Sequence, residues 1–258
     1  TSGAVSVKEV QYATAEGRTI SALLYTPATA SAASPAPGIL GVHGYINSRE
    51  VQSGFAIEFA RRGYVVLTPD QTGYSDAPAF AEGFGGPASL AYLRGLESVD
   101  PNNIGLEGHS MGGWTVLAAA AAMPDGYRSL VLEGSSTGAP FAMDGTPDWP
   151  RNTAVVFSKF DEFAPLMWDV DRGSDTTSSP KLQALFNTAD SIKPGQIYGD
   201  LADGTARVLY QPAVTHPGDH ISPVAIGHAI DWFAQTLEGG RALPSDNQVW
   251  AWKEVGTL

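Results

Sequence analysis

The most informative stretch of the chain is Gly108-His109-Ser110-Met111-Gly112, which matches the pattern G-x-S-x-G. The segment 104–107 precedes it and predicts a strand, and the alanine-rich segment 110–122 follows it and predicts a helix. Small residues at 108 and 112 let the strand and the helix approach each other closely, so that Ser110 projects from a tight turn. The context of strand, turn and helix therefore marks Ser110 as a candidate nucleophile.

Strand and helix patterns alternate on both sides of this turn. The predicted strands are 5–12, 19–25, 38–42, 64–67, 104–107, 129–132, 153–157 and 206–211, and the predicted helices are 51–62, 87–96, 110–122 and 223–237. Gly63 is a C-cap signal, and Ser222 and Pro223 form a helix start. This alternation predicts one α/β domain over residues 1–258, with a mostly parallel sheet covered by helices on both faces.

Composition excludes several classes of protein. Hydrophobic residues make up 43% of the chain and charged residues 16%, which is enough apolar material for a sizeable core. The net charge of −12 and the absence of a Lys/Arg cluster argue against a nucleic-acid partner. The chain has no cysteine, which excludes thiolate catalysis and Cys-based zinc sites. Asp169, Asp171 and Asp175 form a loose acidic set that fits no EF-hand loop, so we expect no metal there.

The C-terminal tail, residues 238–258, carries Trp250 and Trp252 beside Lys253. Such a group could belong to a membrane interface, but packing of the aromatic rings on the domain is the favoured alternative. No apolar run reaches the roughly 18 residues of a membrane span, and no signal peptide is visible. Because the chain starts at Thr1, we expect a processed or trimmed form. The compartment stays open, with an exported or membrane-anchored domain favoured, and membrane association through flanking segments is possible.

Three segments carry a resemblance to a known family. Residues 99–113 resemble the corresponding segment of the dienelactone-hydrolase-like and cutinase-like serine esterases of the α/β-hydrolase superfamily. Residues 42–45 are similar to the H-G-x segment after the third strand, and residues 69–75 resemble the start of a P-D-x-x-G-x-G-x-S loop, with Ser75 in place of the second glycine. The resemblance implies an α/β-hydrolase fold and the hydrolysis of small or polymeric carboxylic esters through an acyl-enzyme, without a cofactor.

The family mechanism also implies an oxyanion hole. Acyl transfer needs two N–H donors aimed at the tetrahedral oxygen. One donor would come from Met111, the residue after the nucleophile. The other, by matching position, would come from Tyr45, whose ring could wall the acyl pocket or simply pack the loop.

The catalytic acid should follow a later strand and precede the histidine. Asp161 follows the predicted strand 153–157 and aligns with the family's G-x-x-D position, although Ser158 replaces the glycine. We expect Asp161 to orient the imidazole of the base. Glu162 is the alternative acid.

The catalytic base is the contested assignment among five histidines. His43 and His109 belong to the motifs already described, and His228 lies in the middle of a predicted helix. The segment 212–216 reproduces the family's P-x-x-[GST]-H and favours His216, whereas residues 220–223 resemble H-F-[AS]-P and favour His220. The spacing to the last strand and helix favours His216. The other histidine is expected to line the pocket rim or to be structural.

The distribution of loop lengths bears on access to the site. Only residues 136–151 separate two predicted strands at the place where related enzymes carry a cap, so we expect no large cap domain and an open site. The extra length forms an insertion, residues 162–205, which is either functional or a packing flap. Two alternative functions are a peptidase or thioesterase with the same triad and a non-catalytic binding domain on a hydrolase core. The intact triad argues against the second.

Overall fold

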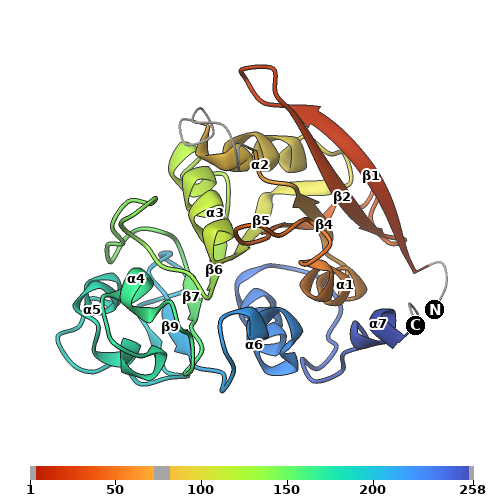
Figure 1. Ribbon diagram of the computed structural model, residues 1–258. Coiled ribbons are helices and arrows are strands. Elements are labelled where there is room, and N and C mark those ends of the chain that lie inside the picture. The colour runs from red at the N-terminus through yellow and green to blue at the C-terminus, as the bar shows by residue number, and fades with distance from the viewer. Residues whose placement is uncertain (1–3, 73–81, 256–258) are drawn as a thin grey trace.

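The computed structural model describes residues 4–72 and 82–255, which form a sheet of nine strands flanked by helices (Figure 1). The strands are β1 (Val5–Ala13), β2 (Thr19–Pro27), β3 (Ala36–Val42), β4 (Val65–Pro69), β5 (Val99–His109), β6 (Ser129–Glu133), β7 (Thr153–Val156), β8 (Ile197–Tyr198) and β9 (Arg207–Tyr210). Their spatial order is β1-β2-β4-β3-β5-β6-β7-β9-β8. The neighbours from β4 to β9 pair in parallel, and only β1, β2 and β8 pair antiparallel. The predicted mostly parallel sheet is therefore confirmed.

Helices cover both faces of the sheet, as predicted. They are α1 (Ser53–Arg61), η2 (Gly83–Gly85), α2 (Gly86–Arg94), α3 (Met111–Ala122), α4 (Ala164–Trp168), η3 (Gly173–Ser178), α5 (Pro180–Phe186), η4 (Pro217–Ile221), α6 (Pro223–Thr236) and α7 (Ala251–Val255). One core lies between the sheet and α2, α3, α4 and α5, and a second core lies between the opposite face and the pair α1 and α6. Figure 1 shows α2 and α3 on one side of the strands and α1 and α6 on the other.

Local sequence signals account for two helix ends. After α1, the N–H groups of Gly63 and Tyr64 donate to the carbonyls of Ala60 and Phe59, and Gly63 has a φ of +89°. This is a Schellman motif, which requires a left-handed residue that glycine adopts without a steric cost. At the start of α6, the hydroxyl of Ser222 accepts a hydrogen bond from the N–H of residue 225. Both predicted signals are thus used.

The connection from residue 134 to residue 152, all of it described, contains one isolated bridge and no helix or strand, so no cap domain stands between β6 and β7. The insertion 162–205 folds into α4, η3, α5 and β8. Leu182, Leu185 and Phe186 of α5 are buried in the core with Trp168 of α4, and Leu166 and Met167 of α4 line the cavity that holds Ser110. The insertion therefore packs on the domain and also contributes to the site described below.

The tail returns to α1 (Figure 1). The carboxylate of Glu58 accepts hydrogen bonds from the backbone N–H groups of Val249 and Trp250 at 2.6 and 2.9 Å. The ring of Trp250 is buried in the core beside α1, and Trp252 is 71% exposed. Packing on the domain, the favoured alternative, thus holds for Trp250. Within the described residues, none of the helices combines the length and the apolar composition needed to cross a membrane.

Candidate active site

Ser110 lies at a sharp turn between β5 and α3. Its backbone has a φ of 54° and a ψ of −121°, a conformation that non-glycine residues rarely adopt. The end of β6 and the residues after it hold this turn. The Ser110 N–H donates to the Glu133 carbonyl at 2.8 Å, and the Ser135 hydroxyl donates to the Ser110 carbonyl at 2.7 Å. A strained residue persists only where its surroundings determine its conformation, and such residues gather at functional sites.

The two glycines of the motif allow this turn to close. A Cβ atom on Gly112 would lie 2.1 Å from the carbonyl oxygen of Val42, and a Cβ atom on Gly108 would lie 2.3 Å from the carbonyl oxygen of Gly112. Both distances are shorter than any real contact of a Cβ atom. The helix can therefore begin directly against β3 and β5 only because both positions lack a side chain.

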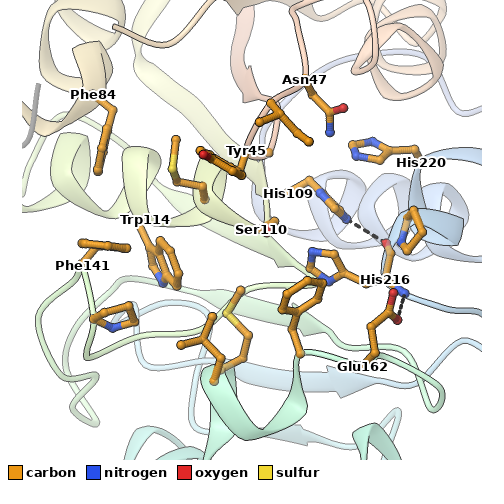
Figure 2. Close-up of a pocket in the computed structure, with 18 residues that line it drawn as sticks. Tyr45, Asn47, Phe84, His109, Ser110, Trp114, Phe141, Glu162, His216 and His220 are labelled. Atoms are coloured by element: carbon orange, nitrogen blue, oxygen red, sulfur yellow. Dashed lines mark hydrogen bonds between the residues drawn. The ribbon is translucent and has the colours of Figure 1, made fainter. Parts of the chain in front are cut away.

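His216 lies beside Ser110 in the same cavity (Figure 2), and Asp161 contacts the ring of His216. Nδ1 of His216 lies 2.8 Å from Oδ2 of Asp161, and both residues are buried. The other oxygen of Asp161 accepts the N–H of Phe163 at 2.8 Å. Because an ionised carboxylate only accepts, Nδ1 carries the proton and Nε2 is left as an acceptor. No hydrogen bond joins the Ser110 hydroxyl to His216 within the described residues; in hydrolases this contact commonly tightens when substrate binds.

His220 has different surroundings. Its ring packs against that of His109 at a tilt of 44°, with 3.9 Å between the centroids, and Figure 2 shows it on the far side of His109 from Ser110. Both ring nitrogens of His220 are buried, and neither has a hydrogen-bond partner among the described residues. Burial lowers the pKa of His220 to about 4, with further lowering by His216 and His43. Within residues 4–72 and 82–255 no carboxylate hydrogen-bonds this imidazole, which is neutral at pH 7.

Glu162, the alternative acid, contacts the backbone of His216 and not its ring. Its Oε2 accepts the N–H of His216 at 3.1 Å. The loose acidic set of the insertion, Asp169, Asp171 and Asp175, is exposed. Over residues 4–72 and 82–255, no group of three or more His, Asp or Glu side chains could hold a metal ion.

The two expected oxyanion donors, Tyr45 and Met111, both line the cavity with Ser110. Met111 is the first residue of α3, so its N–H has no partner within the helix. The segment after β3 passes close to the nucleophile, because a Cβ atom on Gly44 would lie only 3.1 Å from the Cβ atom of Ser110. Tyr45 follows directly, and its side chain is 60% exposed and lines the cavity. The arrangement brings the Tyr45 and Met111 backbones to the same end of the cavity.

Ser110 opens into a cavity of about 760 Å³ whose walls are mostly apolar. Figure 2 shows Phe84, Trp114 and Phe141 on one side of Ser110, with His216 and Glu162 on the other. Three more apolar side chains complete this lining. Phe163 immediately precedes α4, and Leu166 and Met167 are neighbours within the helix.

Sequence reasoning missed most of this wall. Trp114 lies one helical turn beyond Ser110 on the predicted helix, and that spacing is a signal that could have found it. Phe84 and Phe141 come from segments that reach the cavity only through the tertiary fold. The residues 73–75, which complete the P-D-x-x-G resemblance, lie outside the described residues.

The strained serine at a strand-to-helix turn, on a mostly parallel sheet, defines the α/β-hydrolase class. The model of the family described as alpha/beta hydrolase fold matches residues 37–167, and the chain belongs to this family.

Two curated relatives and one solved structure show how far the likeness extends. Esterase YjfP of Escherichia coli (strain K12) is 25% identical over 234 residues, which are 79% of this chain and 90% of YjfP. The quorum-quenching protein AidA of Acinetobacter baumannii (strain MDR-ZJ06) is 34% identical over 110 residues, but these cover only 39% of this chain and 35% of AidA. The structure of a bacterial heroin esterase has a TM-score of 0.61 at 17% identity, over 92% of this chain and 86% of that chain. At this identity the structural likeness shows the fold alone.

Proposed function

We propose that the chain is a serine esterase that hydrolyses carboxylic esters through an acyl-enzyme. Ser110 is the nucleophile, His216 the general base and acid, and Asp161 the residue that orients His216. The observation that carries the proposal is the hydrogen bond of 2.8 Å between His216 and Asp161, beside a serine with a φ of 54°. The relative YjfP, named an esterase, supports the ester as the bond that is cleaved.

The reaction would follow in two halves. Ser110 Oγ attacks the ester carbonyl carbon while its proton passes to Nε2 of His216, and the Tyr45 and Met111 N–H groups stabilise the oxyanion. The bond from carbon to the alcohol oxygen then breaks, and Nε2 returns the proton to the leaving alcohol. In the second half water attacks the acyl carbon, Nε2 accepts its proton, and Ser110 regains that proton as the acid product leaves.

The position of the base divides the cavity between the two parts of the ester. The alcohol must leave on the side of His216, because Nε2 protonates its oxygen. Phe163 lies on this side, with its ring centroid 4.6 Å from that of His216. The acyl group would then extend toward Phe84, Trp114 and Phe141. These aromatic walls favour an apolar acyl group.

Replacement of Ser110 by alanine tests the nucleophile. We expect Ser110→Ala to lower kcat on a short-chain 4-nitrophenyl ester by about a million-fold, the usual effect of losing a triad serine. A fluorophosphonate should add to Ser110 of the wild-type protein, as read by intact-protein and peptide mass spectrometry.

The control for this test is Ser174→Ala, because Ser174 is exposed on η3 and does not line the cavity. This variant should keep full activity. If folded Ser110→Ala turns over the ester at the wild-type rate, the proposed mechanism is wrong. Matched anilide substrates separate an esterase from a peptidase with the same triad.

A further inference from the structure

Three different side chains form hydrogen bonds with His216. Asp161 holds the ring through Nδ1. Glu162 accepts the backbone N–H of His216 at 3.1 Å, and Nε2 of His109 lies 3.0 Å from the backbone carbonyl oxygen of His216. The same carbonyl also faces the N–H of Asp219 at a longer distance of 3.4 Å. Two of the three side chains therefore act on the backbone of His216 and not on its imidazole.

The contact with His109 fixes a direction for the hydrogen bond. A carbonyl oxygen only accepts, so Nε2 of His109 carries the proton and donates it to this bond. Nδ1 is then unprotonated. Burial and the neighbouring imidazoles of His220 and His216 keep the pKa of His109 well below its usual value. His109 thus stays neutral beside His216 and does not compete with it for the proton of the reaction.

His109 also contacts residues on both sides of its ring. It precedes Ser110 in the chain, and its ring centroid lies 4.7 Å from that of His216. On its other side Nδ1 lies against Gly44, where a Cβ atom would come within 3.0 Å of it. Its ring therefore stands between the segment that carries Tyr45 and the loop that carries His216.

The loop of His216 has little regular structure to hold it. It leaves β9 at Tyr210 and enters η4 at Pro217, so His216 takes no part in the sheet. A displacement of about 1 Å at a reacting group can lower a rate about a hundredfold. A clamp on the backbone of His216 would prevent such a displacement relative to Ser110.

We propose that His109 and Glu162 are positioning residues that clamp the backbone of His216 and so hold its imidazole at Ser110. The inference rests on the proposed function, because it assumes that His216 is the base. It assigns a role to the variable residue of the G-x-S-x-G motif and to the carboxylate next to Asp161. Neither side chain needs to touch the substrate for this role.

The test compares substitutions that keep and remove each contact. His109→Leu removes the donor, whereas His109→Gln keeps an N–H near the position of Nε2. Glu162→Leu removes the acceptor, whereas Glu162→Gln keeps a carbonyl oxygen. We expect each leucine variant to lower kcat, and the rate of Ser110 labelling by a fluorophosphonate, on the order of ten- to a hundredfold. KM should change little, and each glutamine variant should regain most of the loss.

The matched control is His228→Leu, because His228 lies on α6 and stacks on Tyr210 away from the cavity. The clamp is refuted if folded His109→Leu has the kcat of His228→Leu, or if His109→Gln is as impaired as His109→Leu. Thermal unfolding checks each variant. If His109→Leu does not fold, His109→Asn replaces it, since its shorter amide does not reach the His216 carbonyl. If the wild-type protein fails to label at Ser110, the proposed function fails, independently of the clamp.

Discussion

Two histidines of one loop differ in what surrounds their ring nitrogens. His216 has the carboxylate of Asp161 at 2.8 Å, which favours the imidazolium that forms during proton transfer. His220 has no partner for either nitrogen among the described residues, and its pKa is lowered to about 4. A base with such a pKa is neutral at pH 7 but binds the serine proton weakly. The surroundings, and not the residue type, thus separate the two roles.

We expect His216→Ala to lower kcat on a 4-nitrophenyl ester by at least about ten-thousandfold, because the proton of Ser110 loses its acceptor. His220→Ala should cost far less, since it removes only a tilted ring contact with His109. The measurement is kcat of each purified variant, with circular dichroism as the check on folding. A dead His220→Ala variant beside an active His216→Ala variant would reverse the assignment.

For single residues, the sequence predicts the candidate catalytic residues better than it predicts the side chains that contact them. Ser110 stands in a local pattern, and its backbone conformation follows from its neighbours in the chain. Both His216 and His220 also match patterns, but only one of them meets a carboxylate. The contact between Asp161 and His216 joins segments that are far apart in the chain. Sequence spacing alone therefore leaves the choice between the two histidines open.

At the scale of elements, the buried carboxylate of Glu58 on α1 contacts the C-terminal tail. Glu58 is fully buried, and its Oε2 pairs with Arg61 and Arg62 at 2.7 Å. Its Oε1 accepts the N–H groups of Val249 and Trp250. A paired buried charge is tolerated only when all its partners are present.

We expect Glu58→Leu to lower the free energy of unfolding by about 3–5 kcal/mol, because Arg62 is then left buried without its carboxylate. Glu58→Gln should cost less, since one amide oxygen can still accept from the tail. Urea denaturation followed by tryptophan fluorescence measures both. The control, Glu9→Gln, removes a surface partner of Arg49 and should cost under about 1 kcal/mol. Equal stability of Glu58→Leu and Glu9→Gln would contradict this account.

The elements of the core follow closely from hydrophobic periodicity, because each buries a regular apolar face. The helices of the insertion 162–205 cannot be predicted in this way. Its extra length is visible in the sequence, but α4 is short and has no face that periodicity could identify. Its place over Ser110 depends on packing against α5 and the sheet, which no local pattern encodes.

For the molecule as a whole, three buried carboxyl groups link stability to pH. Burial raises the pKa of Glu107 to about 8 and that of Asp219 to about 8, and it holds the pKa of Glu133 well above its usual value. The hydrogen bonds from Gln52 to Glu107 and from Ser158 to Asp219 oppose these shifts without cancelling them. The folded protein therefore holds protons that the unfolded chain releases at lower pH.

The raised pKa values determine whether the folded protein gains or loses stability as pH rises. A carboxyl group with a raised pKa in the folded state stabilises the fold fully below its unfolded pKa, near 4.5 for Glu107, and this contribution is lost as pH rises toward about 8. We expect the melting temperature to fall over this window. Glu107→Gln, which cannot ionise, should flatten the fall by up to a few kcal/mol in unfolding free energy. Thermal melts from pH 5 to 9 measure it, and a variant with the wild-type slope would contradict the pKa assignment.

The strand order has a consequence for how activity is acquired. β5, which carries Ser110, lies in the middle of the sheet between β3 and β6, whereas His216 lies beyond β9 near the opposite edge from the β1–β2 hairpin. A chain that emerges N-terminus first thus completes the serine turn well before its base arrives. During refolding, reactivity toward a fluorophosphonate should consequently lag behind the recovery of helical circular dichroism, because it requires the long-range approach of His216 to Ser110 whereas each helix forms from local contacts. The rate at which labelling of Ser110 appears would then report when β9, the segment with His216 and α6 pack onto the rest of the sheet.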